Sequence, residues 1–274
     1  MLKKLLEIVL VIALFIWASF TKDTNLQAEL YGMVIGGSAI LIIDGIVFIY
    51  NERAFLNLYW DCFKPFVRPE LRLTIAYLYR IEMNGKYLLV KSKRLHNTYQ
   101  PVGGVYKYYN PEAKLELDKI GAITCNKVGN DDVSEFDLRL NLTNRNKIIR
   151  FLKWFFKAEK REIDPWREFY EELVSTEILP AKAFTYIHYE LVGQHFEQIH
   201  WDEFFEINTF KYADIYVPKF INARQIEEVK KLLSHSSDEY IWATRKEIMQ
   251  GKSTRNELIA EHSYKIFHNK KLKQ

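Results

Sequence analysis

Two apolar runs near the N-terminus constrain this chain more than any other feature of its sequence. The first covers residues 5–20 and the second residues 30–50, and each contains only two polar interruptions. A helix that crosses a bilayer needs about 20 predominantly apolar residues, within a range of about 17–25. The second run reaches that length unaided, and the first reaches it with Leu2 and Thr21 at its ends. We therefore predict two transmembrane helices, at about residues 5–21 and 30–50.

A signal peptide for the first run, or buried core helices for both, are the alternatives. Ala18, Ser19 and Phe20 make a poor small-x-small cleavage site, which disfavours a signal peptide. The second run follows after a short loop, Thr21–Glu29, which favours an uncleaved helical hairpin over residues 1–50. Cationic side chains concentrate on the cytoplasmic side of membrane proteins. That loop contains one cationic side chain, Lys22, whereas the cations at the outer ends of the two runs are Lys3, Lys4, Arg53, Lys64, Arg68 and Arg72. Both termini are therefore predicted to be cytoplasmic.

Four residues within the apolar runs are candidates for membrane assembly. Gly32 and Gly36 form a G-x-x-x-G pair, and such a surface lets two helices approach closely. Glu7 and Asp44 are carboxylates inside the spans, where an ionisable group is costly and often functional. They either face a helix interface or a wet pore, or they reach the cytoplasmic membrane surface.

The composition excludes several classes of protein. Hydrophobic residues make up 48% of the 274, near the usual value for soluble proteins, which excludes a polytopic membrane protein and a disordered chain. Two cysteines exclude a disulfide scaffold. A net charge of +4 is too weak to indicate duplex nucleic acid as a partner, although a local basic pocket for a small anion remains open.

The rest of the chain indicates a separate domain. Residues 51–69 form an aromatic juxtamembrane linker, and Pro65 and Pro69 prevent a helix from continuing out of the membrane. Strands are predicted at residues 71–81 and 87–93, with Asn84-Gly85 as the hairpin turn between them. Later features are a tight turn at Gly103-Gly104, a strand at 136–142, a basic helix at about 145–159 and a helix capped by Asp164 and Pro165.

Gly104 and the run Arg167–Glu172 resemble the two halves of a Nudix box. The residues that match its R-E-U-x-E-E half are Arg167, Glu168, Phe169, Glu171 and Glu172. On a helix the three glutamates share one face, where hard oxygen ligands suit Mg²⁺. The resemblance implies that they would be catalytic and metal-binding in an active member of the family.

The match departs from the box at three places. Asn110 stands where the first glutamate belongs, and Val174 replaces the closing glycine. An insertion over about residues 111–163 separates the two halves. These departures favour a domain that binds its ligand without hydrolysing it.

A two-helix transmembrane hairpin followed by an α+β Nudix-like domain at residues 70–274 resembles one specific group. These are the two-transmembrane Nudix effectors of CBASS, the bacterial anti-phage signalling by cyclic oligonucleotides. The resemblance implies a multi-pass protein of the bacterial inner membrane with a mixed sheet between helices. It implies a cyclic di- or trinucleotide as ligand and a cyclic-oligonucleotide synthase as functional partner. Ligand binding would drive homo-oligomerisation in the lipid bilayer, membrane disruption and abortive infection, with no cofactor required for sensing.

Such a ligand needs cations for its phosphates and aromatic faces for its bases. Two alternatives remain open: a tethered pyrophosphohydrolase acting on nucleoside diphosphate derivatives with Mg²⁺, and a membrane adaptor. The basic helix at 145–159 forms either a face of the domain or a contact with anionic head groups. The candidate ligand-binding residues are Arg80, Lys91, Arg94, Tyr99, Gln100, Gly103, Gly104, Tyr106, His195 and Trp201.

Overall fold

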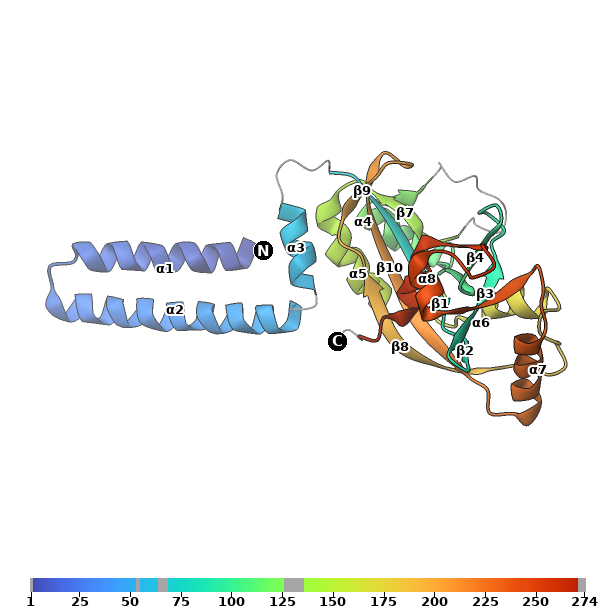
Figure 1. The fold of residues 1–274 in the computed structure, drawn as a ribbon. Helices are drawn as coiled ribbons and strands as arrows, with labels where there is room; N and C mark the ends of the chain where they lie inside the picture. The colour runs from blue at the N-terminus through green and yellow to red at the C-terminus, as the bar shows by residue number, and fades with distance from the viewer. Residues whose placement is uncertain (1, 53–54, 64–68, 126–135, 271–274) are drawn as a thin grey trace. The chain divides into compact units, whose positions relative to one another are not determined.

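The computed structural model describes residues 2–52, 55–63, 69–125 and 136–270. The chain divides into two compact units, Met1–Leu56 and Asn57–Lys273. The first unit is a helical hairpin, and the second is a mixed α/β domain (Figure 1).

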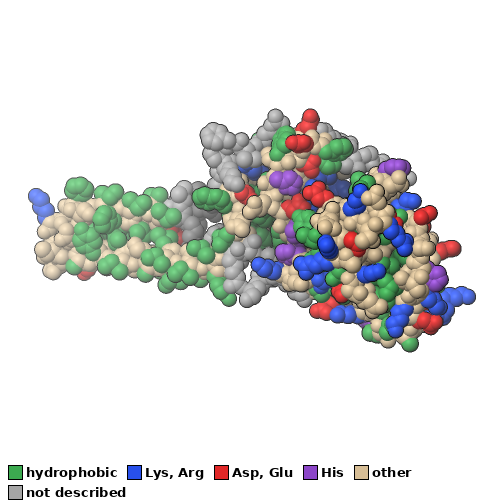
Figure 2. Space-filling model, viewed as in Figure 1, with side chains coloured by type: hydrophobic (Ala, Val, Ile, Leu, Met, Phe, Trp, Pro, Cys, Tyr) green, Lys and Arg blue, Asp and Glu red, His purple; other side chains and the backbone are tan. Residues whose placement is uncertain are grey.

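Helices α1 (Leu2–Phe20) and α2 (Thr24–Glu52) form the hairpin. The connecting loop is shorter than predicted, because the Asp23 carboxylate accepts hydrogen bonds from the backbone N–H groups of Asn25 and Leu26 and so starts α2 at Thr24. The stretch Thr24–Val47 is long and apolar enough to cross a membrane, whereas the apolar stretch of α1 described, Glu7–Phe20, is shorter. Apolar side chains cover the visible face of both helices (Figure 2).

Helix α3 (Leu56–Phe63) lies in the segment predicted as a linker. Its residues Leu58 and Cys62 are buried, and the Cys62 thiol lies 3.5 Å from the carbonyl oxygen of Arg145. Arg145 was predicted to project from a basic helix, yet it is only 7% exposed. The Arg145 backbone N–H donates to the carbonyl of Pro69, which ties the start of the domain to the turn η2 (Arg145–Lys147).

The larger sheet has seven strands, with β1 and β10 at its centre. These two run parallel, so that Arg72 lies beside Thr209 and Tyr79 beside Tyr216. Strand β8 pairs with β10, β7 with β1, and β6 with β7, all antiparallel. The sheet is therefore mixed, as predicted. Its strands are β1 (Leu71–Tyr79), β5 (Gly103–Val105), β6 (Ala122–Thr124), β7 (Arg139–Leu142), β8 (His188–Phe196), β9 (His200–Asp202) and β10 (Ile207–Lys219).

Helices cover one face of this sheet. Phe155 of α5 (Ile148–Phe156) packs edge-on against Tyr106 and Tyr212, and Phe169 of α6 (Trp166–Phe169) packs against Tyr79. Helix α5 corresponds to the basic helix predicted at about residues 145–159, but it is shorter, and most of its side chains are buried. Helices α4 (Glu112–Ile120) and α7 (Ala223–Ser234) also belong to this domain.

A second, five-stranded sheet covers part of the other face, where helices were expected. Leu78 and Ile215 of the large sheet pack against Leu89, Ile241 and Ala243 of the small one. Helix α8 (Arg245–Gln250) and the 3-10 segment η4 (Glu261–Phe267) close this core with Ile248 and Ile266. The small sheet consists of β2 (Glu82–Met83), β3 (Lys86–Lys91), β4 (Thr98–Gln100), β11 (Tyr240–Thr244) and β12 (Leu258–Ile259).

The predicted hairpin at Asn84-Gly85 exists but joins different partners. Both turn residues have positive φ, 52° and 74°, and they connect β2 to β3. Strand β1 was predicted to pair with β3 across this turn. Instead β1 belongs to the large sheet, because the chain changes sheets between Tyr79 and Glu82.

Candidate functional site

Gly103 and Gly104 lie in strand β5 rather than in the predicted tight turn. Strand β5 pairs antiparallel with β1, placing Gly104 beside Tyr77. A Cβ atom on Gly104 would lie 1.9 Å from Oε1 of Glu168. Glycine therefore lets the carboxylate of Glu168 approach the strand backbone. The backbone N–H of Gly103 donates a 2.9 Å hydrogen bond to Oε2 of Glu172.

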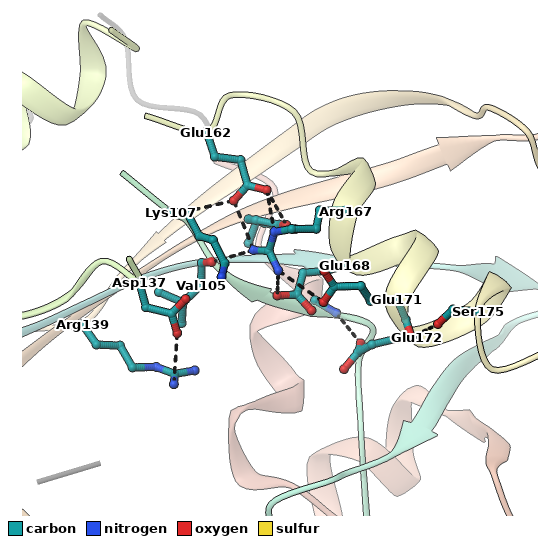
Figure 3. A network of polar contacts seen from close by, with 12 residues as sticks. Val105, Lys107, Asp137, Arg139, Glu162, Arg167, Glu168, Glu171, Glu172 and Ser175 are labelled. Atoms are coloured by element: carbon teal, nitrogen blue, oxygen red, sulfur yellow. Dashed lines mark hydrogen bonds and ion pairs between the residues drawn. The ribbon is translucent and has the colours of Figure 1, made fainter. Parts of the chain in front are cut away.

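Arg167 is the centre of the polar network around β5 (Figure 3). Its guanidinium donates to Glu162 at 2.9 and 3.2 Å, to Glu168 at 2.7 Å and to Glu171 at 3.4 Å. It also donates to the carbonyl oxygen of Val105 at 3.0 Å. One cation thus holds three carboxylates and a backbone acceptor. Such charge-assisted hydrogen bonds fix the orientation of the side chains as well as their charge.

The two ends of the glutamate run lie in different kinds of helix. The Asp164 carboxylate accepts a hydrogen bond from the backbone N–H of Trp166 at 2.8 Å, although Pro165, and not Asp164 as predicted, stands at the N-cap position of α6. From Tyr170 to Val174 the chain forms a π-helix, η3. Wider turns of this kind often occur at functional sites. Here the wider turn accompanies the separation of Glu172, which faces Gly103, from Glu168 and Glu171, which face Arg167.

This arrangement does not converge on a metal position. Among the described residues, no group of three or more His, Cys, Asp or Glu side chains is placed to hold a metal ion. One oxygen of each glutamate already has a partner: Oε1 of Glu168 and Oε2 of Glu171 pair with Arg167, and Oε2 of Glu172 accepts from Gly103. The donor set predicted from the sequence is present, and part of it is used within the domain.

Burial governs the protonation of these carboxylates. It raises the pKa of Glu172 to about 8, and the Gly103 N–H and the charge of Lys93 oppose that shift. Burial also raises the pKa of Glu168, opposed by the charge and hydrogen bond of Arg167. Protonating Glu172 at neutral pH lowers the negative charge of the site, which reduces repulsion of an anionic ligand.

A basic, polar face of the large sheet lies close to the network. In the β1–β7 register Thr74 pairs with Arg139 and Arg72 with Asn141, so these side chains share one face. Arg139 makes a 3.2 Å ion pair with Asp137. Its pKa is lowered mainly by burial and by the charges of Arg94 and Arg72, while Asp137 and Glu168 raise it. The predicted ligand residue Arg94 therefore lies near cations that the sequence reasoning missed.

Glu162 is the most consequential residue missed by sequence reasoning. Its side chain is buried. The carboxylate accepts hydrogen bonds from Arg167, from the Lys107 backbone N–H at 3.1 Å and from the Tyr77 hydroxyl at 3.4 Å. The first glutamate of the box was expected at position 110, where this chain has Asn110. The carboxylate that accepts hydrogen bonds from Arg167 instead belongs to Glu162, at the end of the insertion. The signal in the sequence is a glutamate five residues before Arg167 in a polar run.

The structure disperses the remaining predicted ligand residues. The rings of Tyr99 and Tyr106 are buried, so neither offers a stacking face; Tyr106 donates a 2.7 Å hydrogen bond to the buried Asp214. Arg80 hydrogen-bonds Asn269 at 2.7 Å. Lys91 and Gln100 lie on β3 and β4 of the small sheet. His195 packs against Tyr264 and His268, and Trp201 lies on β9.

Comparison with known proteins places the second unit in a protein family. A family model described as the SMODS-associated NUDIX domain matches residues 70–267. No curated protein matches significantly, and no solved structure does. The matched range covers strands β1 to β12 and includes both halves of the box.

Proposed function

Since the chain belongs to the SMODS-associated NUDIX domain family, we propose that it is a membrane effector of SMODS/CBASS-type anti-phage defence. In this proposal the NUDIX domain binds a cyclic di- or trinucleotide made by a partner synthase. The helical hairpin then assembles and disrupts the bacterial inner membrane, with both termini in the cytoplasm.

The observation that carries the membrane part is the apolar surface of the hairpin. Ile35, Ile42 and Ile46 of α2 are 70%, 62% and 61% exposed, and the spanning stretch is only 6% buried within the structure. Contiguous exposed apolar surfaces of this kind mark sites of membrane or protein contact. A bilayer would remove this surface from water over the apolar stretch Thr24–Val47 of α2.

Self-association is supported by the glycines of α2. A Cβ atom on Gly37 would lie 2.8 Å from Val11, so Gly37 faces α1 inside the hairpin. A Cβ atom on Gly32 or Gly36 would meet nothing within 4 Å. These two glycines therefore remain open to a helix from another copy of the chain, which can approach closely there.

Binding without hydrolysis is supported by the Arg167 network. Glu168 and Glu171 are held by Arg167, and Glu172 is held by Gly103, so the carboxylates of the box serve as internal structure. Arg94 and Arg139 supply positive charge on the adjacent sheet face for the phosphates of a ligand. The tethered pyrophosphohydrolase remains the second candidate, because all three glutamates of R-E-x-x-E-E are retained.

The test uses the full chain in lipid nanodiscs. The protein is titrated calorimetrically with a panel of cyclic di- and trinucleotides and nucleoside diphosphate derivatives in the presence of Mg²⁺, and the ligand is recovered and chromatographed. We expect one cyclic nucleotide to bind and to be recovered intact, and to release dye from vesicles that contain the protein. Turnover of a diphosphate without binding of any cyclic nucleotide would establish the hydrolase instead.

A further inference from the structure

A pocket of about 580 Å³ lies at the start of β1, on the face of the large sheet that carries Arg139. Its volume falls within the range of small-molecule sites, roughly 300–1,000 Å³. Its walls come from β1, β6, β7 and the β9–β10 hairpin (Figure 1). The residues that matter for recognition are Arg72, Asn141, Trp201, Phe205, Glu70 and Glu206.

The floor of the pocket carries a donor and an acceptor side by side. Arg72 is only 4% exposed; one of its terminal nitrogens donates to Thr74, and its Nε has no hydrogen-bond partner among the described residues. The Asn141 Oδ1 atom, opposite Arg72 in the strand register, is also buried and lacks a partner in the described part of the chain. Unsatisfied buried polar atoms destabilise a fold, and a ligand edge that pairs with both removes that cost.

The remaining side chains select for a flat and uncharged group. The Arg72 guanidinium lies 3.6 Å from the centre of the Phe205 ring, which fixes its plane. Trp201 is 46% exposed and adds a second aromatic wall. Among the described lining residues, Glu70 and Glu206 bring two carboxylates against one cation, Arg72, so a phosphate is repelled while the amino and ring N–H groups of a heterocycle find acceptors.

We infer that this pocket binds a nucleobase of the ligand, with Arg72 and Asn141 pairing with the base edge and Trp201 forming a stacking wall. The inference rests on the proposed nucleotide sensing and locates one base of that ligand. Arg139 connects the two regions, since its pKa responds to Arg72 on one side and to Glu168 on the other. The phosphates then lie toward Arg94 and Arg139, outside the pocket.

The experiment uses the full chain in nanodiscs, labelled with 5-fluorotryptophan. The chain has six tryptophans, and the Trp201 fluorine resonance is assigned by its loss in Trp201→Phe. The probes are AMP, GMP, CMP and UMP at about 10 mM, which detects millimolar affinity, and ribose 5-phosphate, which lacks a base. We expect at least one nucleotide to shift the Trp201 resonance saturably and ribose 5-phosphate to leave it unchanged.

Variants separate recognition from folding. Asn141→Leu keeps the strand and removes the acceptor, and we expect it to weaken nucleotide binding at Trp201 by about 5- to 150-fold, the discrimination typical of base-edge pairing. Tyr186→Ala removes a similarly exposed aromatic ring (52%) that does not line the pocket, and it leaves the affinity unchanged.

Three results overturn the inference: no response to any of the four nucleotides, an equal response to ribose 5-phosphate, or an unchanged affinity in Asn141→Leu. Calorimetric binding of a cyclic nucleotide without a Trp201 response overturns the base pocket and leaves the proposed sensor intact. Absence of both signals overturns both.

Discussion

At the scale of single residues, Gly103 and Gly104 resist substitution for different reasons. Gly103 has φ 152°, and a Cβ atom there would lie 2.2 Å from the Tyr77 carbonyl oxygen, which belongs to a buried central strand. The three atoms nearest to a Cβ atom on Gly104 are Oε1, Cδ and Cγ of Glu168, at 1.9, 2.1 and 2.7 Å, so that side chain would have to move away from Arg167. We expect Gly103→Ala to destabilise the domain by about 2 kcal/mol or more, and Gly104→Ala by less, because a side chain can move where a buried strand backbone cannot. Thermal unfolding followed by near-UV circular dichroism measures both, and equal effects would contradict the geometry.

Glu162 gives the second prediction at this scale. Replacing it by Gln removes the charge that pairs with Arg167 while keeping the shape of the side chain. We expect Glu162→Gln to lower the free energy of unfolding by about 1–3 kcal/mol, because Glu162 is buried and Arg167 is mostly so. Glu116→Gln breaks an exposed pair with Lys160 and serves as the control, which should leave unfolding unchanged. Equal free energies of unfolding in the two variants would contradict a stabilising role for Glu162.

His195 predicts how stability depends on pH. Both its ring nitrogens are buried, and burial, reinforced by Lys265 and His268 and opposed by Glu197, lowers the pKa to about 4. The unfolded chain has an ordinary histidine pKa of about 6.5, so it binds the proton first as the pH falls. The contribution of His195 to stability is therefore complete above about pH 6.5 and is lost toward pH 4, by up to about 3 kcal/mol. Burial also lowers the pKa of His262 to about 4, so unfolding measured across that range should lose only part of its slope in His195→Leu. It should keep the full slope in His235→Gln, an exposed histidine; an unchanged slope in His195→Leu would contradict the assignment.

At the scale of elements, the local signals in the sequence were sufficient for some features and silent on others. The long apolar run of α2 and the Asn84-Gly85 turn are local patterns in the sequence, and both elements are present in the structure. The pairing of β1 with β10 joins residues more than a hundred positions apart, and nothing local indicates it. The five-stranded second sheet has the same non-local origin, since β3 pairs with β11 near the end of the domain.

The candidate site shows the same division. The sequence order of Gly104, Arg167 and the three glutamates identified the elements that meet. It did not indicate that Arg167 would bind the glutamates itself, because that depends on Glu162 and on the π-helix η3. Tyr99 is buried in the core between the two sheets, and Tyr106 is buried against Phe155 of α5. Both positions depend on long-range packing, which an isolated aromatic cluster does not reveal.

Helix α2 carries the prediction at this scale. Gly32 is open, so Leu at that position blocks close approach of another helix without disturbing the hairpin. We expect Gly32→Leu to abolish ligand-induced leakage of dye from vesicles while calorimetric ligand binding survives. Ile35→Leu, at a position 70% exposed on the same helix, is the matched control and should retain leakage. Full leakage in Gly32→Leu would exclude this face from assembly.

At the scale of the whole molecule, the chain joins a SMODS-associated NUDIX domain to a hairpin of two apolar helices. The two are separate compact units, so the domain can change its association state without unfolding the hairpin. The coupling we propose is one of concentration: domains brought together by ligand raise the effective concentration of their hairpins in the bilayer. No rearrangement within a single chain is needed for this mechanism.

Assembly in the membrane makes the final prediction quantitative. If the lesion needs several hairpins, its rate must depend on how many copies meet, so leakage at saturating ligand should rise more steeply than linearly with the protein-to-lipid ratio. Vesicles loaded with a self-quenched dye and reconstituted over a range of ratios provide the measurement. Gly32→Leu should remove the steep dependence together with the leakage, because it blocks the face through which hairpins meet. A strictly linear dependence would show that a single chain opens the membrane, and the open glycine face would then serve some other contact.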